Sequence, residues 1–205
     1  TEKSSLIKEI ANSINDKTLL FSVALYEKDF GAIVNNFDQF DHALKEDYDL
    51  TKYLSDVVDL FIKNNFRNEE IAKKLLTRHI GGKYSRKQIA FLALQIHDFD
   101  FIKKAFNKEH IENDVALLER LAQIDKESTL NFIKSKKDFL HRHWSDIVPL
   151  FNFLKKCYSP QIIKKYVQDN QDAFRTSSHL KKHLKEECNI FISQKEGVLT
   201  VEVKG

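Results

Sequence analysis

Apolar residues recur at intervals of three and four positions along most of this chain, which is the period of an amphipathic helix. Few residues interrupt the pattern, because the 205 residues include only 5 Gly and 2 Pro. The pattern therefore predicts an all-α protein made of successive helices. The clearest predicted helices cover Leu6–Ile14, Leu19–Tyr26, Tyr53–Lys63, Glu69–His79, Lys87–Ile96, Val115–Ile124, Ile147–Lys156 and Gln161–Gln168.

Residues that favour helix N-termini precede five helix starts. Side chains of Ser, Asn and Asp accept hydrogen bonds from amides of the first turn, and Pro suits the first helical position. The predicted starts therefore agree with the periodicity. They are Asn68 before Glu69, Ser85 before Arg86, Asn113-Asp114 before Val115, Ser145-Asp146 before Ile147 and Ser159-Pro160 before Gln161.

The last 18 residues have a different pattern, with β-branched and aromatic residues that roughly alternate with polar ones. This predicts a β-hairpin with strands Asn189–Ser193 and Val198–Val203 around a turn at Gln194–Gly197. An isolated hairpin is marginally stable. We therefore expect this hairpin to lie against the last helices, to pair with another chain or to continue a sheet of a longer protein. We divide the chain into a helical repeat domain, residues 1–187, and this hairpin, residues 188–205.

Four similar tetrapeptides indicate an internal repeat. They are Ile71–Lys74, Phe101–Lys104, Phe132–Ser135 and Ile162–Lys165, and their first residues are 30, 31 and 30 positions apart. Each follows an acidic or amide residue, and an apolar helix end lies about ten residues upstream of each. A period near 30 predicts an α-solenoid of helical hairpins, in which each hairpin buries one face against its neighbours.

The repeat resembles a known family. Residues Leu92–Phe106 are similar to the helix-turn-helix half of an ankyrin repeat, and Glu70–Leu76 resembles its second helix. No unit has the Thr-Pro-Leu-His opening, the turn glycine is missing, and the period is two or three residues short. The resemblance is to a degenerate ankyrin-like array over Leu19 to about Phe174, and another helical-hairpin family fits nearly as well. Both families imply a scaffold that binds proteins.

Composition narrows the class of protein. With 31 % charged residues and no apolar run long enough for a bilayer span, we expect a soluble globular protein. Only Cys157 and Cys188 are present, which favours a reducing compartment, and we expect a cytoplasmic location. Charge is uneven, because residues 1–70 carry 8 Lys and Arg against 14 Asp and Glu, whereas residues 131–187 carry 12 against 6.

Basic residues recur at the repeat period, so a regular solenoid would align them into a stripe. Such a stripe favours an acidic protein partner, or alternatively the phosphates of a nucleic acid. The simpler interpretation is that these lysines are solvated helix positions. The candidate binding residues are Lys73, Lys74, Arg78, Lys83, Arg86, Lys103, Lys104, Lys134, Lys164 and Lys165.

Motifs for catalysis and metal binding are weak. The pair His179 and His183 has the spacing of metal ligands, but no second pair of ligands accompanies it. Glu202-Val203-Lys204 imitates a nuclease element, but it lies on a bare hairpin without a further acidic strand residue. No nucleophile elbow or Gly-rich nucleotide loop is present. We therefore expect a non-catalytic protein without a cofactor or metal. Besides the protein-binding scaffold and the nucleic-acid-binding repeat protein, a third hypothesis is that the chain is a fragment of a larger assembly, whose hairpin completes a neighbour's sheet.

Overall fold

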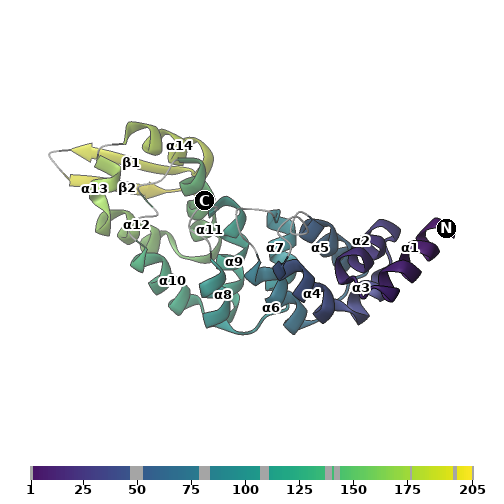
Figure 1. Cartoon of the computed structure of the whole chain (residues 1–205). Coiled ribbons are helices and arrows are strands. Elements are labelled where there is room, and N and C mark those ends of the chain that lie inside the picture. The colour runs from purple at the N-terminus through teal and green to yellow at the C-terminus, as the bar shows by residue number, and fades with distance from the viewer. Residues whose placement is uncertain are drawn as a thin grey trace. The chain divides into compact units, whose positions relative to one another are not determined.

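The computed structural model describes residues 2–46, 53–78, 84–106, 111–136, 140, 144–175, 177–195 and 198–204. Within these residues the chain is mostly helical, with fourteen helices followed by one two-stranded antiparallel sheet (Figure 1). The chain divides into two compact units, which we call unit 1 (Thr1–Ile96) and unit 2 (His97–Gly205). This division differs from the predicted boundary at 187/188, because the hairpin packs within unit 2.

Unit 1 contains seven of the described helices, and unit 2 contains the other seven with the hairpin. In unit 1 they are α1 (Glu2–Ser13), α2 (Lys17–Glu27), α3 (Phe30–Asn35), α4 (Phe37–Glu46), α5 (Leu54–Lys63), α6 (Glu69–Thr77) and α7 (Arg86–Ala93). In unit 2 they are α8 (Phe99–Ala105), α9 (Ile111–Ile124), α10 (Lys126–Ser135), α11 (Trp144–Cys157), α12 (Pro160–Asp169), α13 (Gln171–Arg175), α14 (Ser178–Cys188), β1 (Ile190–Lys195) and β2 (Val198–Val203). Each of the eight helices predicted from periodicity overlaps an observed one.

Two of the five predicted helix starts are wrong. Asn113-Asp114 lies inside α9, which begins at Ile111, and Ser145-Asp146 lies inside α11, which begins at Trp144. Asp114 is fully buried, so this polar residue belongs to the helix interior rather than to a cap. The starts at Asn68 and Ser85 are confirmed by side-chain cap hydrogen bonds. Ser159 holds the N-cap position before Pro160, but it makes no cap hydrogen bond.

A common local arrangement recurs at the start of α3, α6, α8, α10 and α12. The fourth residue after each N-cap is at most 1 % exposed, so each helix directs the same position into the core. The caps are 39, 30, 27 and 34 residues apart, so their spacing is less regular than that of the tetrapeptides, and the same burial occurs at Val57 of α5 and Ile89 of α7. The caps with their buried residues are Asp29 with Ile33, Asn68 with Ala72, Asp98 with Ile102, Asp125 with Thr129, and Ser159 with Ile163.

Aromatic side chains join successive helices of unit 1. Phe61 of α5 is 2 % exposed, and its ring lies 5.9 Å from Phe30 at the start of α3 and 6.2 Å from Phe37 of α4. Phe66, in the turn after α5, lies 5.0 Å from Phe61 and 5.4 Å from Phe30. These four rings form an aromatic cluster that fixes the α5–α6 turn against α3 and α4. The backbone amide of Asn68 also donates a 2.7 Å hydrogen bond to the Gln95 side chain, beyond the end of α7.

We expect the substitution Asn68→Ala to lower the free energy of unfolding by about 1 kcal/mol. The Asn68 side chain accepts a 3.0 Å hydrogen bond from the Ile71 amide, and alanine leaves this amide without the cap. Urea denaturation followed by circular dichroism measures the change. Asn68→Asp is the matched control, because aspartate retains the acceptor. Equal destabilisation by both substitutions would contradict the assignment of the cap.

Unit 2 is built around α9 and α11, with the other helices and the hairpin packed around them (Figure 1). Phe151 of α11 is fully buried between Tyr166 of α12 and Phe174 of α13, each with ring centres 6.0 Å away. The Tyr158 hydroxyl donates a 2.9 Å hydrogen bond to the Lys126 carbonyl, which joins the α11–α12 turn to the start of α10. Successive helix pairs of unit 2 are therefore linked through their turns.

The C-terminal residues form the predicted hairpin, with Ile190 opposite Val203 and Lys195 opposite Val198. Strand β1 packs against α14 and β2 against α12. Gln194 and Lys195, which were predicted to lie in the turn, belong to β1, and residues 196–197 lie outside the described part of the chain. The Lys155 ammonium group fixes the hairpin further, since it donates hydrogen bonds to the carbonyls of Cys188 at 2.8 Å and Lys204 at 2.9 Å.

Candidate functional site

The predicted basic residues fall into both units, and we describe the two sets separately. Unit 1 holds Lys73 and Lys74 on α6, Arg78 at the C-cap of α6, and Arg86 at the start of α7. Lys83 lies outside the described residues. Unit 2 holds the remaining five lysines, on α8, α10 and α12, and they are Lys103, Lys104, Lys134, Lys164 and Lys165.

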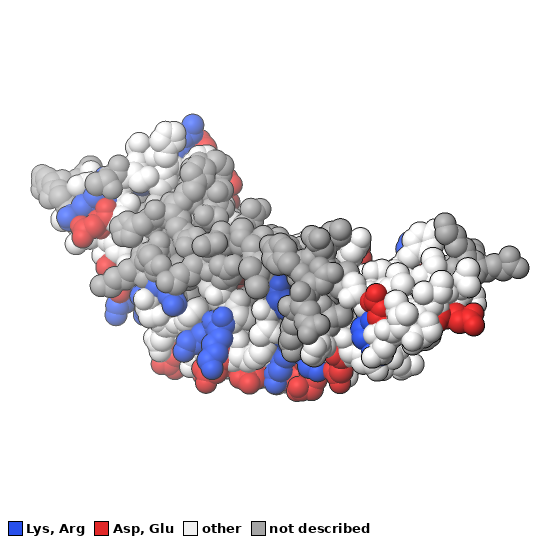
Figure 2. Space-filling model, viewed as in Figure 1, with Lys and Arg blue, Asp and Glu red and all other residues white. Residues whose placement is uncertain are grey.

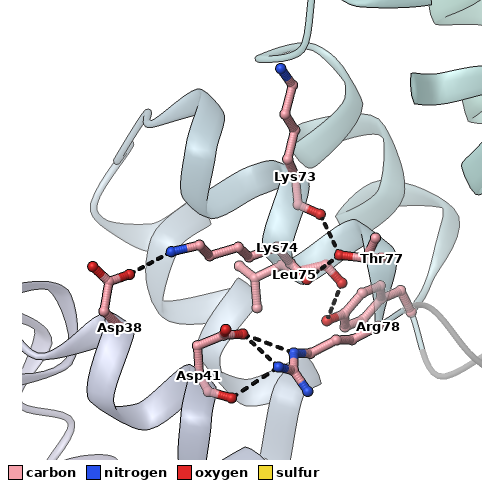
Figure 3. Close-up of polar contacts among 8 residues, drawn as sticks. Asp38, Asp41, Lys73, Lys74, Leu75, Thr77 and Arg78 are labelled. Carbon is pink, nitrogen blue, oxygen red and sulfur yellow. Dashed lines mark hydrogen bonds and ion pairs between the residues drawn. The ribbon is translucent and has the colours of Figure 1, made fainter. Parts of the chain in front are cut away.

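Arg78 contacts Asp41 of α4 rather than solvent (Figure 3). Its Nε and Nη2 atoms donate hydrogen bonds of 2.9 Å and 2.7 Å to the Asp41 carboxylate, and Nη2 also donates to the Asp41 carbonyl at 2.9 Å. The side chains are only 16 % and 8 % exposed. Both carboxylate bonds converge on Oδ1, and charge-assisted hydrogen bonds of this kind are strong. Arg78 therefore joins the end of α6 to α4 through a mostly buried ion pair.

The two lysines of α6 also contact carboxylates within unit 1. Lys74 is 2.5 Å from Asp38 of α4, and this hydrogen bond raises the pKa of Lys74 (Figure 3). Lys73 is 3.2 Å from Glu69, one turn earlier on the same helix. Figure 2 shows basic atoms beside acidic ones on the visible face of unit 1. The charge that these residues offer to a partner is therefore partly neutralised within the unit.

The lysines of unit 2 differ from those of unit 1. Lys103 lies at the limit of an ion pair with Asp100, 3.9 Å away. Lys104, Lys134 and Lys165 are exposed and Lys164 is half-buried, and among the described residues none of these four forms an ion pair. We call Lys104, Lys134, Lys164 and Lys165 the free lysine set. Figure 2 shows a group of basic side chains on the visible face of unit 2.

Four other lysines of unit 2 make contacts within the unit. The Lys126 ammonium group lies 5.4 Å from the centre of the Tyr158 ring, and that of Lys136 lies 5.3 Å from the Phe132 ring. Lys156 is 3.1 Å from Glu119, and Lys155 holds the hairpin as described above. The sequence pattern alone does not separate these lysines from the free lysine set, because the contacts of Lys126, Lys155 and Lys156 join residues 32 or more positions apart.

The free lysines do not occupy the equivalent positions in their helices that the repeat spacing of the sequence had suggested. Lys104, Lys164 and Lys165 lie five or six residues after the N-caps of α8 and α12, in the second turn. Lys134 lies nine residues after the N-cap of α10, in its last turn, because Phe132–Ser135 ends that helix. Lys134 is therefore not equivalent to the other three lysines. Figure 1 shows α8, α10 and α12 in succession along one edge of unit 2.

Two weak motifs of the sequence, at His183 and at Lys204, have contacts with neighbouring residues in the structure. Within that part of the chain, no three His, Cys, Asp or Glu side chains gather at a site for a metal ion. His183 hydrogen-bonds to Glu187 at 2.8 Å, one turn along α14. Lys204 lies 3.8 Å from Glu202 and 4.6 Å from the centre of the Phe191 ring. Burial raises the pKa of the Cys188 thiol to about 11, which makes it a weak nucleophile at neutral pH.

Comparison with known proteins found no match to a family model, to a curated protein or to a solved structure. None of the described helices is long and apolar enough to cross a lipid bilayer.

Proposed function

We propose that this chain is a non-catalytic scaffold of helical-hairpin repeats that binds an acidic protein partner through the free lysine set of unit 2. The observation that carries the proposal is the contrast between the recurring basic residues of α6 and those of α8, α10 and α12. Basic residues of α6 contact carboxylates of their own unit, whereas Lys104, Lys134, Lys164 and Lys165 form no ion pair among the described residues.

The repeated cap-and-core arrangement supports a scaffold. Seven helices, α3, α5, α6, α7, α8, α10 and α12, have a buried residue four positions after the N-cap. Turns of neighbouring helix pairs contact each other through Tyr158 in unit 2 and Asn68 in unit 1. Repeats of this kind bury little surface alone and gain stability from their neighbours. We extend the proposal to an α-solenoid with an ankyrin-like or related architecture.

Charge supports an acidic partner. Residues 131–187 carry 12 Lys and Arg against 6 Asp and Glu, and three of the free lysines lie in this segment. An uncompensated positive surface accelerates association with an acidic protein and selects against basic ones. A nucleic acid is the second candidate for the same lysines, and salt dependence distinguishes the two.

Binding of a fluorescent 16-residue polyglutamate peptide to the whole chain tests the proposal. We expect measurable binding at 50 mM salt, and at least tenfold weaker binding after replacing all four free lysines with glutamine. The matched control is Lys73→Gln with Lys74→Gln, which removes two basic residues that already have acidic partners. This control is expected to change the dissociation constant less than threefold.

The same measurement with a 16-nucleotide single-stranded oligonucleotide addresses the alternative. Binding to phosphates weakens by orders of magnitude between about 50 and 200 mM salt. Tight, salt-steep oligonucleotide binding that exceeds polyglutamate binding would favour the nucleic-acid function. Equal losses for both sets of lysine substitutions would contradict the assignment to unit 2.

A further inference from the structure

The hairpin directs one row of main-chain groups on β2 away from β1. In an antiparallel ladder, opposite residues alternate between pairs that exchange main-chain hydrogen bonds and pairs whose N–H and C=O groups point outward. The Lys204 amide donates to the Asn189 carbonyl at 3.0 Å, so these residues form a hydrogen-bonded pair. The next pair, Ile190 and Val203, is therefore an outward-pointing one. Along β2 the outward groups belong to every second residue, namely Leu199, Val201 and Val203.

These outward groups have no partner within the described part of the chain. No hydrogen bond outside the hairpin reaches the N–H or C=O of Leu199, Val201 or Val203 among the described residues. Buried main-chain groups are nearly always hydrogen-bonded, so an unbonded row of this kind is open to water or to another chain. We call these three residues' outward main-chain groups the β2 edge.

Strand β2 lacks the features that usually protect such an edge. Neither Pro nor Lys lies within it, and Glu202 is its one charged residue. Leu199 and Val201 are 4 % and 6 % exposed, so their side chains anchor the strand in the core of unit 2. The strand is therefore held extended before any partner arrives, which lowers the entropic cost of adding a further strand.

The charge beside the β2 edge is mainly positive. Helix α12 packs against β2, and it carries Lys164 and Lys165 of the free lysine set (Figure 1). The carboxylates of these two elements are Asp169, the last residue of α12, and Glu202, which lies 3.8 Å from Lys204. An extended segment on the β2 edge therefore lies next to a helix with two lysines that form no ion pair among the described residues.

A second copy of this chain fits the β2 edge less well than an acidic segment does. Pairing β2 with the same strand of another copy brings two α12 helices to one junction, because each α12 packs against its own β2. The junction then holds Lys164 and Lys165 twice, without added carboxylates to compensate them. Acidic side chains on a different protein compensate the same lysines.

We propose that the β2 edge binds an extended, acidic segment of the protein partner as a third strand of the sheet. The main chain of the segment pairs with Leu199, Val201 and Val203, and its carboxylates contact Lys164 and Lys165. Main-chain pairing provides affinity in complexes of this kind, and side chains provide specificity. This inference rests on the proposed function as a scaffold for an acidic partner, and it names the conformation in which that partner binds.

Removing one outward amide from β2 tests the proposal. Cys188 allows the whole chain to be assembled by native chemical ligation of a 1–187 thioester to a synthetic 188–205 segment. One protein carries N-methylvaline at position 201, which blocks the β2 edge and leaves the bonds between β1 and β2 in place. The matched control carries N-methylisoleucine at position 192, directly opposite, which blocks the outward amide of β1 instead.

The probe is a fluorescent 16-residue peptide of alternating Glu and Thr at 50 mM salt, because Thr favours extended structure. We expect it to bind the unmodified chain at least as tightly as polyglutamate does, although it carries half the charge. N-methylation at position 201 is expected to raise the dissociation constant at least tenfold, and N-methylation at position 192 less than twofold. An ester in place of the Val201 amide removes the donor without added bulk, and is expected to weaken binding about fivefold. Equal urea midpoints check that each assembled protein is folded.

The outcomes separate this inference from the proposed function. Polyglutamate binding without binding of the alternating peptide would overturn strand addition alone. Equal effects of the modifications at positions 201 and 192, or no effect of either, would also overturn it, because the lysines then bind the partner without main-chain pairing. If neither acidic peptide binds the unmodified chain, the proposed function is wrong, and this inference is wrong with it.

Discussion

Replacing Phe61 with Ala is expected to lower the free energy of unfolding of unit 1 by about 3–5 kcal/mol. The Phe61 ring is 2 % exposed and contacts the rings of Phe30, Phe37 and Phe66. Alanine removes these contacts and leaves a cavity between α3, α4 and α5. Urea denaturation followed by circular dichroism measures the loss, and hydrogen exchange resolved to peptides locates it in residues 1–96.

Two further variants show whether packing explains this effect. Phe61→Leu retains most of the volume and is expected to cost about 1–2 kcal/mol. Tyr26→Ala removes an aromatic ring that is 83 % exposed, and is expected to change stability by less than about 0.5 kcal/mol. If Phe61→Ala were as stable as Tyr26→Ala, the aromatic cluster would not hold the helices of unit 1 together.

Replacing Arg78 with Met is expected to destabilise unit 1 by about 2 kcal/mol. The substitution leaves Asp41, whose side chain is 8 % exposed, without its guanidinium contact, and a buried carboxylate that loses such a contact is costly. Arg78→Lys is expected to recover only part of the loss, because a compact ammonium group cannot reproduce the hydrogen bonds that the planar guanidinium makes to both Oδ1 and the carbonyl of Asp41. Urea midpoints of the three proteins measure the difference.

Lys74→Met is the matched control for Arg78, on the same helix and facing the same neighbour α4. The Lys74–Asp38 pair is exposed, at 39 % and 84 %, and exposed pairs contribute at most about 1 kcal/mol. We therefore expect a much smaller loss than for Arg78→Met. Equal losses from the two substitutions would show that burial does not set the strength of the Arg78–Asp41 contact.

Sequence periodicity predicted the helices better than it predicted their first residues. Helical period and scarce breakers are local properties, so the helical class and the C-terminal hairpin followed from the chain alone. The helix start predicted at Asn113-Asp114 was wrong because polar residues with high N-cap preference also occur inside helices. Asp114 is fully buried in α9. Preference for a cap is local, whereas burial of Asp114 depends on packing against distant residues.

The candidate site was less predictable than the fold. Recurring basic pairs suggested one equivalent set of lysines, but Lys134 lies in the last turn of α10 and the others in second turns. In the sequence, Arg78 also resembled the other basic residues of the predicted stripe. Its partner Asp41 is 37 residues away in sequence, and no local pattern identifies such a contact. The ion pairs of Lys74 with Asp38 and of Arg78 with Asp41 distinguish these basic residues from the free lysine set. Both pairs depend on the packing of α4 against α6.

Lysine acetylation, measured for each residue by mass spectrometry with and without bound polyglutamate, shows whether the free lysine set is the binding surface. We expect polyglutamate to protect Lys104, Lys134, Lys164 and Lys165, while Lys73 and Lys74 react at the same rate in both samples. Protection of Lys73 and Lys74 to the same degree, or no protection in unit 2, would contradict the claim that the free lysine set is the binding surface.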